Sequence, residues 1–175
     1  ENNVLVIIDE VQTGNGRTGE LYAFMKYGVL PDIVSTAKGL GNGLPIGATM
    51  FGEKVKDVLI PSSHGSTFGG NPIACAGAIN VINRIDDQLL KEVEQKSQFI
   101  INALKNAEGI KSISGMGFML GIETQKDAGE IIKYCIDNGV LVIKAKNKLR
   151  LLPALNIPQN LLEKADMVIK KGCAL

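Results

Sequence analysis

The hydrophobic residues in the first half of the chain gather in short, unbroken runs. Residues 4–8 (VLVII) are all apolar and mostly β-branched, which is typical of a strand buried on both faces of a parallel sheet. Residues 32–36 (DIVST) predict a second strand, and residues 48–51 predict a third. Between the first two, residues 20–28 favour a short helix that ends at Gly28. The segments that connect these elements are polar and rich in glycine, so we expect them to be loops.

A helix of small residues is expected from residue 71, and from Asp86 onward apolar residues recur at near-helical spacing among charged residues. Asn71 followed by Pro72 is typical of a helix start, and that helix should reach about residue 85. The elements expected after it are helices at 86–107, 127–138 and 158–171, and strands at 110–114, 118–124, 140–144 and 149–152. The first half of the chain is rich in glycine with buried strands, and the second is a more regular succession of helices and strands. This change predicts a domain boundary near residue 87.

The composition excludes several functional classes. Nineteen basic and eighteen acidic residues give a net charge of +1, so no charge excess attracts the chain to nucleic acid or to an anionic membrane. There is a single histidine, His64, and the three cysteines (Cys75, Cys135 and Cys173) are far apart. A zinc site or a disulfide framework needs ligands or cysteines at short spacing, so we expect no metal site and reduced thiols in a cytoplasmic protein.

The start of the chain and its glycine content are unusual. The sequence begins at Glu1 without methionine and enters an apolar run at once, so we expect a piece of a longer protein. The chain contains no run of 18 apolar residues, so the sequence predicts no membrane span. The chain has 20 glycines, where the usual share of ~7% would give about 12.

One glycine cluster, residues 14–19 (GNGRTG), fits the G-x-G-x-x-G pattern of dinucleotide-binding turns. In that motif the glycines follow the strand directly and open a helix whose N-terminus binds the pyrophosphate. Here residues 9–13 intervene, and Asp9 and Glu10 would repel a phosphate. The acidic residue that normally follows could only be Asp32, at the start of the next strand. We therefore interpret the cluster as a tight loop.

Two charged residues at the ends of neighbouring predicted strands carry the chemistry. Asp9 follows the first strand, and Lys38 follows the second among small residues and glycines. Each alone has an ordinary explanation, as a turn cap or a solvated lysine. Together they can bind opposite ends of one flat heterocycle. Desolvation of Lys38 would favour the neutral, nucleophilic form of its amine. Pyridoxal 5'-phosphate (PLP) requires this arrangement: a Schiff base on lysine and a carboxylate that keeps the pyridine nitrogen protonated.

Around these two residues the sequence resembles the class III PLP-dependent aminotransferases. The matching blocks, in family order, are residues 9–14 (DEVQTG), 16–19 (GRTG), 31–32 (PD), 36–41 (TAKGLG), 45–47 (PIG), 64–72 (HGSTFGGNP) and 149–153 (LRLLP). The resemblance implies an α/β protein with fold type I of PLP-dependent transferases. Residues 1–87 would be the C-terminal part of the large PLP-binding domain, and residues 88–175 the small α+β C-terminal domain.

The resemblance also implies roles for residues near the first strand. Asp9 would pair with the pyridine nitrogen, Gln12 would contact the 3-oxygen of the ring, and Val11 would pack on one ring face. Lys38 would bind PLP covalently and then move the proton between the substrate α-carbon and the cofactor. Taken alone, Val11 is more often a core residue than a cofactor contact.

Further residues would complete the site. Thr67, with Ser66, would bind the phosphate of the neighbouring subunit, so that each site needs a homodimer; alone, Thr67 beside glycines fits a plain turn. Arg150 would face a substrate carboxylate or pair with an acidic residue, although an arginine in such a strand is by default at a surface edge. His64 is interpreted as a structural loop residue.

Within the class, the motifs are most similar to those of acetylornithine aminotransferases. This similarity implies transfer of the terminal amino group of N2-acetylornithine to 2-oxoglutarate in arginine biosynthesis. Aminotransferases of ornithine, 4-aminobutyrate or succinyl-diaminopimelate are the alternatives. A third hypothesis is that the piece alone is a non-catalytic module, because the family's Gly-Thr phosphate cup, ring-stacking aromatic residue and substrate-sorting residues would precede Glu1.

Overall fold

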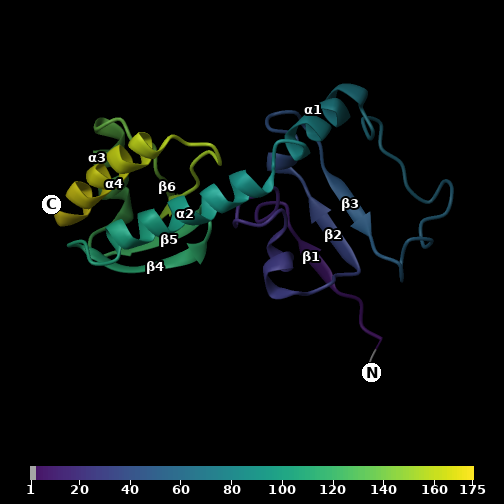
Figure 1. Ribbon diagram of the computed structural model, residues 1–175, viewed down its shortest axis with the longest axis horizontal. Helices are drawn as coiled ribbons and strands as arrows, with labels where there is room; N and C mark the ends of the chain where they lie inside the picture. The colour runs from purple at the N-terminus through teal and green to yellow at the C-terminus, as the bar shows by residue number, and fades with distance from the viewer. Residues whose placement is uncertain (1–2) are drawn as a thin grey trace. The chain divides into compact units, whose positions relative to one another are not determined.

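The chain divides into two compact units, residues 1–90 and 91–175, and each contains its own β-sheet (Figure 1). The structure, a computed structural model, describes residues 3–175. The assignment of these units as parts of a large and a small domain stays a proposal.

The first unit is built on a three-stranded mixed sheet in the order β1-β2-β3. Strand β1 (Ile7–Asp9) runs parallel to β2 (Ile33–Thr36), which pairs antiparallel with β3 (Ala48–Phe51). The second and third predicted strands are confirmed. Asp9 lies opposite Ser35 in the register, so the carboxyl ends of β1 and β2 meet at the same edge of the sheet.

The prediction that residues 4–8 are buried on both faces is wrong for this chain. Val4 and Ile7 are 71% and 65% exposed, and only residues 7–9 form the strand. The physical reason is that, among the residues described, β2 is the only element that packs extensively against β1, so the faces of β1 have no covering helix.

Asp32 ties the segment before β1 to the start of β2. Its Oδ2 accepts a hydrogen bond from the Val6 amide at 2.8 Å, and its Oδ1 lies 3.1 Å from Nζ of Lys54. The Val6 hydrogen bond first, and then Lys54, hold the pKa of this carboxyl below its usual range. Asp32 thus has a structural role at the base of the sheet.

Two short 3-10 helices and one α-helix complete the first unit. The helix expected at 20–28 is a 3-10 helix, η1 (Ala23–Tyr27), which ends at Gly28 with a φ of 62°. A second 3-10 helix, η2 (Lys38–Leu40), follows β2 directly, where the sequence predicted only loop. Helix α1 (Pro72–Ile82) begins as predicted, because the Asn71 side chain accepts hydrogen bonds from the amides of the first turn.

The second unit is a four-stranded antiparallel sheet, in the order β4-β5-β7-β6, with three helices packed against it. Its elements are α2 (Asp87–Leu104), β4 (Ile110–Met116), β5 (Met119–Thr124), α3 (Ala128–Asp137), β6 (Ile143–Ala145), β7 (Lys148–Leu151) and α4 (Gln159–Ala174). All were predicted, although β6 begins three residues later than expected and α4 continues three residues further. Helix α2 begins in the first unit and supplies core residues from residue 93 onward.

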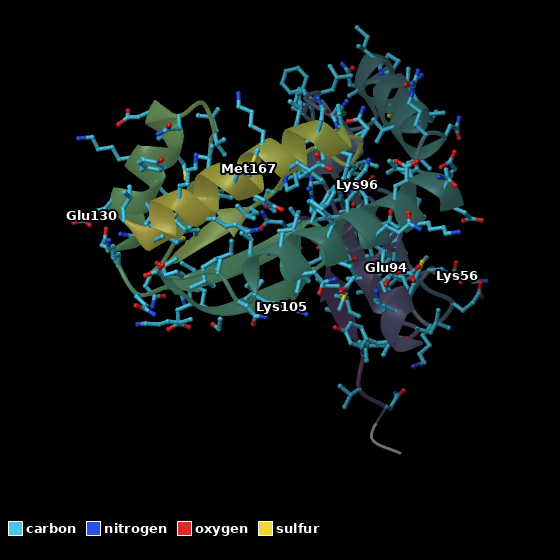
Figure 2. The ribbon with its side chains drawn as sticks, turned by 60° about the vertical axis from the view of Figure 1, so that its left-hand side comes forward. Lys56, Glu94, Lys96, Lys105, Glu130 and Met167 are labelled. Atoms are coloured by element: carbon cyan, nitrogen blue, oxygen red, sulfur yellow. The ribbon has the colours of Figure 1, made fainter. Side chains whose placement is uncertain are left out.

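The core of the second unit lies between one face of this sheet and the helices. In β5, Leu120 and Ile122 are buried while alternate residues are partly exposed, which is the period of a strand with one covered face. Ile100 of α2 and Ile169 of α4 belong to the same buried cluster. Charged side chains such as Lys105, which follows the last residue of α2 and is labelled in Figure 2, are exposed.

All three cysteines are free, and Cys135 and Cys173 are buried. Burial raises the pKa of the Cys173 thiol to about 11, so this thiol stays protonated at neutral pH. No helix in residues 3–175 is long and apolar enough to cross a membrane.

Candidate active site

The structure brings Asp9 and Lys38 to the same edge of the first sheet. Asp9 is the last residue of β1, and Lys38 follows the end of β2 by two residues. Both residues are exposed, and the Val11 amide donates to Asp9 Oδ1 at 2.8 Å. Within residues 3–175, Asp9 Oδ2 and the Lys38 amine make no other hydrogen bond or ion pair, so both remain available to a ligand.

The expectation that Lys38 is desolvated is not met by this chain alone. Its side chain is exposed, as is Gly39 beside it, whereas Gly41 is buried against Leu44 and Ile46. The small residues beside Lys38 are evident from the sequence, but the solvent exposure of its amine is not. The described residues therefore position the amine without removing it from water.

The backbone of Lys38 is unusual for a residue with a side chain. Its φ is 48°, in the left-handed region that lysine rarely adopts. Leu40 and Gly41 donate to the carbonyls of Ala37 and Lys38, which closes the tight turn of η2. Backbone strain of this kind occurs at functional sites when the surrounding structure holds it in place.

The loop after β1 is organised by Glu10, a role that the sequence pattern does not indicate. Glu10 is 1% exposed, and its carboxylate accepts hydrogen bonds from the Thr13 hydroxyl and from the Phe24 amide, the latter at 2.9 Å. The GNGRTG cluster lies inside this closed loop as a series of turns and does not open an α-helix. Asn15, the second residue missed, bridges to the end of β2; a polar residue between two glycines was the only signal for it.

Val11 and Gln12 lie in the same loop, directly after the Asp9–Glu10 pair. Both are partly buried, and the Gln12 side chain has no hydrogen-bond partner in the described part of the chain. The structure therefore places them beside Asp9 without fixing them to protein groups. Their proposed contacts with a cofactor ring are untested.

The loop before α1 carries His64, Ser66 and Thr67, and all three are exposed. The Gly69 amide donates to the Ser66 carbonyl at 3.3 Å, which forms a turn before the helix. None of the contacts described for residues 3–175 links these side chains to Asp9 or Lys38. These three side chains are therefore available for contacts outside the described chain.

Arg150 lies in the second unit on β7, between β5 and β6, so the edge position suggested as a default is wrong. It lines a cavity of about 410 Å³ whose walls are otherwise mostly apolar, for example Val140, Leu141 and Leu161. Within the described chain its guanidinium forms no hydrogen bond or ion pair. It can therefore accept an anion.

Asp166 of α4 lines the same cavity and is 4% exposed. Its Oδ2 has no hydrogen-bond partner among residues 3–175, and burial raises the pKa of this carboxyl to about 7, against a weaker opposing effect of Lys170. Residues 3–175 contain no group of three or more histidine, cysteine, aspartate or glutamate residues that could hold a metal ion.

The chain is similar over most of its length to curated acetylornithine aminotransferases. It is 44% identical over 169 residues to the protein from Haemophilus ducreyi, covering 95% of this chain and 43% of the relative. It is 43% identical over 172 residues to the protein from Clostridium acetobutylicum, covering 94% and 44%. The chain thus spans less than half the length of these relatives.

Solved structures of two related enzymes have the same fold. The ornithine aminotransferase of Toxoplasma gondii, whose active site is partially occupied by PLP, superposes with a TM-score of 0.90 at 35% identity, over 98% of this chain and 43% of that one. The acetylornithine aminotransferase of Elizabethkingia anophelis gives a TM-score of 0.89 at 33% identity, over 97% and 45%. These similarities confirm the predicted α/β transferase fold.

The family model for class III aminotransferases matches residues 1–172, which is nearly the whole sequence. The class implies PLP as the cofactor, in agreement with the chemistry expected from Asp9 and Lys38. With sequence, fold and strand-end residues in agreement, the chain belongs to the class III aminotransferase family.

Proposed function

We propose that this chain supplies the lysine-bearing part of a PLP-dependent aminotransferase. The observation that carries the proposal is the position of Asp9 and Lys38, exposed and without a partner for Oδ2 or the amine, at the carboxyl ends of two neighbouring parallel strands. Open α/β sheets bind their ligands at this edge. The residues present fit PLP, because an acid and an amine lie at the same edge of the sheet beside glycine-rich turns.

Bound PLP supplies an electron sink, and the residues of this chain bind it and move protons. The Asp9 carboxylate would hold the proton on the pyridine nitrogen, and the Val11 amide orients that carboxylate. Gln12 would donate to the ring 3-oxygen, and Val11 would pack on the ring. The Lys38 amine would hold the cofactor and would carry the proton at the reacting carbon of the substrate.

We also propose a homodimer in which Ser66 and Thr67 bind the phosphate at the partner's site. Their hydroxyls are exposed on the loop before α1 and have no protein partner in residues 3–175. Large apolar side chains on and beside this loop are exposed too: Ile60 by 68% and Phe68 by 82%. Exposed apolar groups of this size support an interface between subunits.

For the substrates we propose N2-acetylornithine as the amino donor and 2-oxoglutarate as the acceptor, in the cytoplasm, with N-acetylglutamate 5-semialdehyde and glutamate as the products. The names of the curated relatives support this choice. Arg150 would bind a substrate carboxylate, which its unpaired guanidinium suits. Ornithine is the alternative that the solved structures favour, and 4-aminobutyrate and succinyl-diaminopimelate remain further alternatives.

The decisive experiment traps the cofactor on its lysine. The full-length protein is incubated with PLP, reduced with borohydride and digested, and the pyridoxyl peptide is mapped by mass spectrometry. We expect one label, on Lys38. Lys38→Ala should abolish turnover, a loss of at least about 10³-fold, and leave the thermal transition in place. Lys56→Ala, an exposed lysine paired only with Glu53, is the matched control and should keep activity. Full turnover in Lys38→Ala would exclude the assigned role.

The same labelling applied to residues 1–175 alone tests the third hypothesis. Label on the full-length protein and none on residues 1–175 would show that this piece is not catalytic by itself. A panel of amino donors, assayed with the full-length enzyme and 2-oxoglutarate, then selects the substrate. We expect the highest kcat/KM with N2-acetylornithine; a higher value with ornithine would select the alternative.

A further inference from the structure

The lysine of the proposed site stands in a backbone conformation that needs an outside restraint. The φ of Lys38 is 48°, whereas Ala37 before it is extended, with a φ of −164°. A residue with a Cβ enters the left-handed region at an energetic cost, which persists only when neighbouring groups over-determine it. The hydrogen bonds within η2 close the turn but do not connect it to the rest of the unit.

Asn15 supplies that connection. Its side-chain Nδ2 donates to the Thr36 hydroxyl at 3.0 Å and to the Ala37 carbonyl at 3.2 Å. The Ala37 carbonyl belongs to the peptide plane that enters Lys38, so fixing it restricts the φ of the lysine. Thr36 is the last residue of β2, is buried and pairs with Ala48 of β3, so this end of the bridge is fixed to the sheet.

Asn15 itself is held firmly from the other side. It is 5% exposed and has a φ of 56°, a conformation that asparagine tolerates better than most residues. Gly14 before it donates to the Glu10 carbonyl at 3.0 Å, and a Cβ on Gly14 would lie only 2.7 Å from that oxygen. A Cβ on Gly39 would lie 3.4 Å from Asn15 Cβ, so the two loops are in close contact.

We infer that Asn15 is a positioning residue that holds the Lys38 backbone in its left-handed conformation and so couples the loop after Asp9 to the lysine. This inference rests on the proposed function of Lys38. The side chain must be an amide of this length. Aspartate has no N–H to give to the two oxygens and would place a negative charge against the Ala37 carbonyl, and glycine has no side chain.

Two variants and a control separate positioning from folding. Asn15→Gly keeps the freedom for a positive φ and removes the amide, and Asn15→Asp keeps the shape and removes the donor. Asn42→Gly is the matched control, because Asn42 is an exposed asparagine with a φ of 45° in the same glycine-rich stretch. All are made in the full-length protein.

The first readout needs no cofactor. Hydrogen exchange of the apo-protein should speed up at residues 38–41, by at least tenfold in both Asn15 variants, while the amides of β2 upstream keep their wild-type rates. The second readout is the rate at which PLP becomes trapped on Lys38 by borohydride, which should fall by about 10- to 100-fold because the amine is no longer pre-positioned. Asn42→Gly should leave both unchanged.

The outcomes distinguish this inference from the proposed function. If Lys38 is not labelled even in the unsubstituted protein, the proposed function fails. If Lys38 is labelled at rates within twofold of each other in all proteins, the positioning role is overturned while the proposed function stands. Faster exchange spread evenly over the sheet, or loss of folding in both Asn15 variants, would also overturn it, because Asn15 would then serve the fold as a whole.

Discussion

Asp166 places a carboxyl group in the core of the second unit with one oxygen unpaired, and its protonation should control stability. Burial raises the pKa of this group from 3.8 to about 7. Between these two values the folded protein keeps the proton and the unfolded chain has lost it. The group's contribution to stability is therefore complete below pH 3.8 and is lost as the pH rises through about 7. We expect Asp166→Asn to raise the free energy of unfolding at pH 8 by on the order of 2 kcal/mol, with little change near pH 4.

Urea denaturation at several pH values measures this effect. Asp137→Asn, at an exposed aspartate of α3, is the control and should change the free energy of unfolding by less than about 0.5 kcal/mol. Lys170 on the same helix, which acts on Asp166, and Arg150 and Lys164, which line the same cavity, are left unchanged. A variant whose stability follows pH as the wild type does would assign the pH dependence to other groups.

Single residues were predictable where their chemistry follows from their place at the end of a strand. Asp9 and Lys38 were found in this way, because the carboxyl ends of parallel strands meet at one edge. Glu10 and Asn15 were missed, since their importance depends on burial and on contacts with residues more than ten positions away. Asp166 was missed for the same reason. Its place in the helical pattern of α4 does not show that it is buried in a mostly apolar cavity.

At the scale of the element, the cap of α1 provides a direct test. Asn71 Oδ1 accepts hydrogen bonds from the amides of Ile73 and Ala74, both at 3.1 Å. Helix α1 buries few residues, with Ala74 and Ala78 the only ones below the surface, so tertiary packing adds little to the cap. We expect Asn71→Ala to destabilise the helix by about 1 kcal/mol and to speed hydrogen exchange at its first turn about fivefold.

Asn71→Asp is the matched control, because a carboxylate accepts the same two hydrogen bonds and also suits the positive end of the helix dipole. Its exchange rates should stay at or below those of the wild type. Equal exchange in the alanine variant and the wild type would show that the loop before the helix, and not the cap, limits fraying.

Elements were predictable where capping residues and periodicity agreed, as at Asn71 and in β5, whose buried positions alternate. The burial of β1 was not predictable. An apolar run shows that a strand suits a buried position, but it does not show whether another element packs against it. Helix η2 was missed because its turn depends on a positive φ at Lys38, a conformation that no propensity assigns to lysine.

At the scale of the whole molecule, the sequence placed the change of texture near residue 87, and the structure divides the chain between Leu90 and Lys91. The strand order β4-β5-β7-β6 was not readable, because it depends on β6 folding back along β7 at the far edge. Family membership was readable because it rests on short blocks of residues. Substrate choice was not, since the chain spans under half of its relatives.

The second unit contains everything that an independent domain requires, so a polypeptide of residues 86–175 should fold alone. Its buried cluster is drawn entirely from residues 93–173, and starting at Asp86 keeps the hydrogen bond from the Leu89 amide to the Asp86 side chain at the start of α2. About 90 residues suffice for a single core.

We expect one cooperative thermal transition by circular dichroism. Ile122→Ala should destabilise it by about 2–5 kcal/mol, because Ile122 is fully buried. Met167→Ala, at a 58% exposed position of α4, should have an effect below about 0.5 kcal/mol. A broad transition without cooperativity would show instead that this unit needs residues 1–85 to hold its structure.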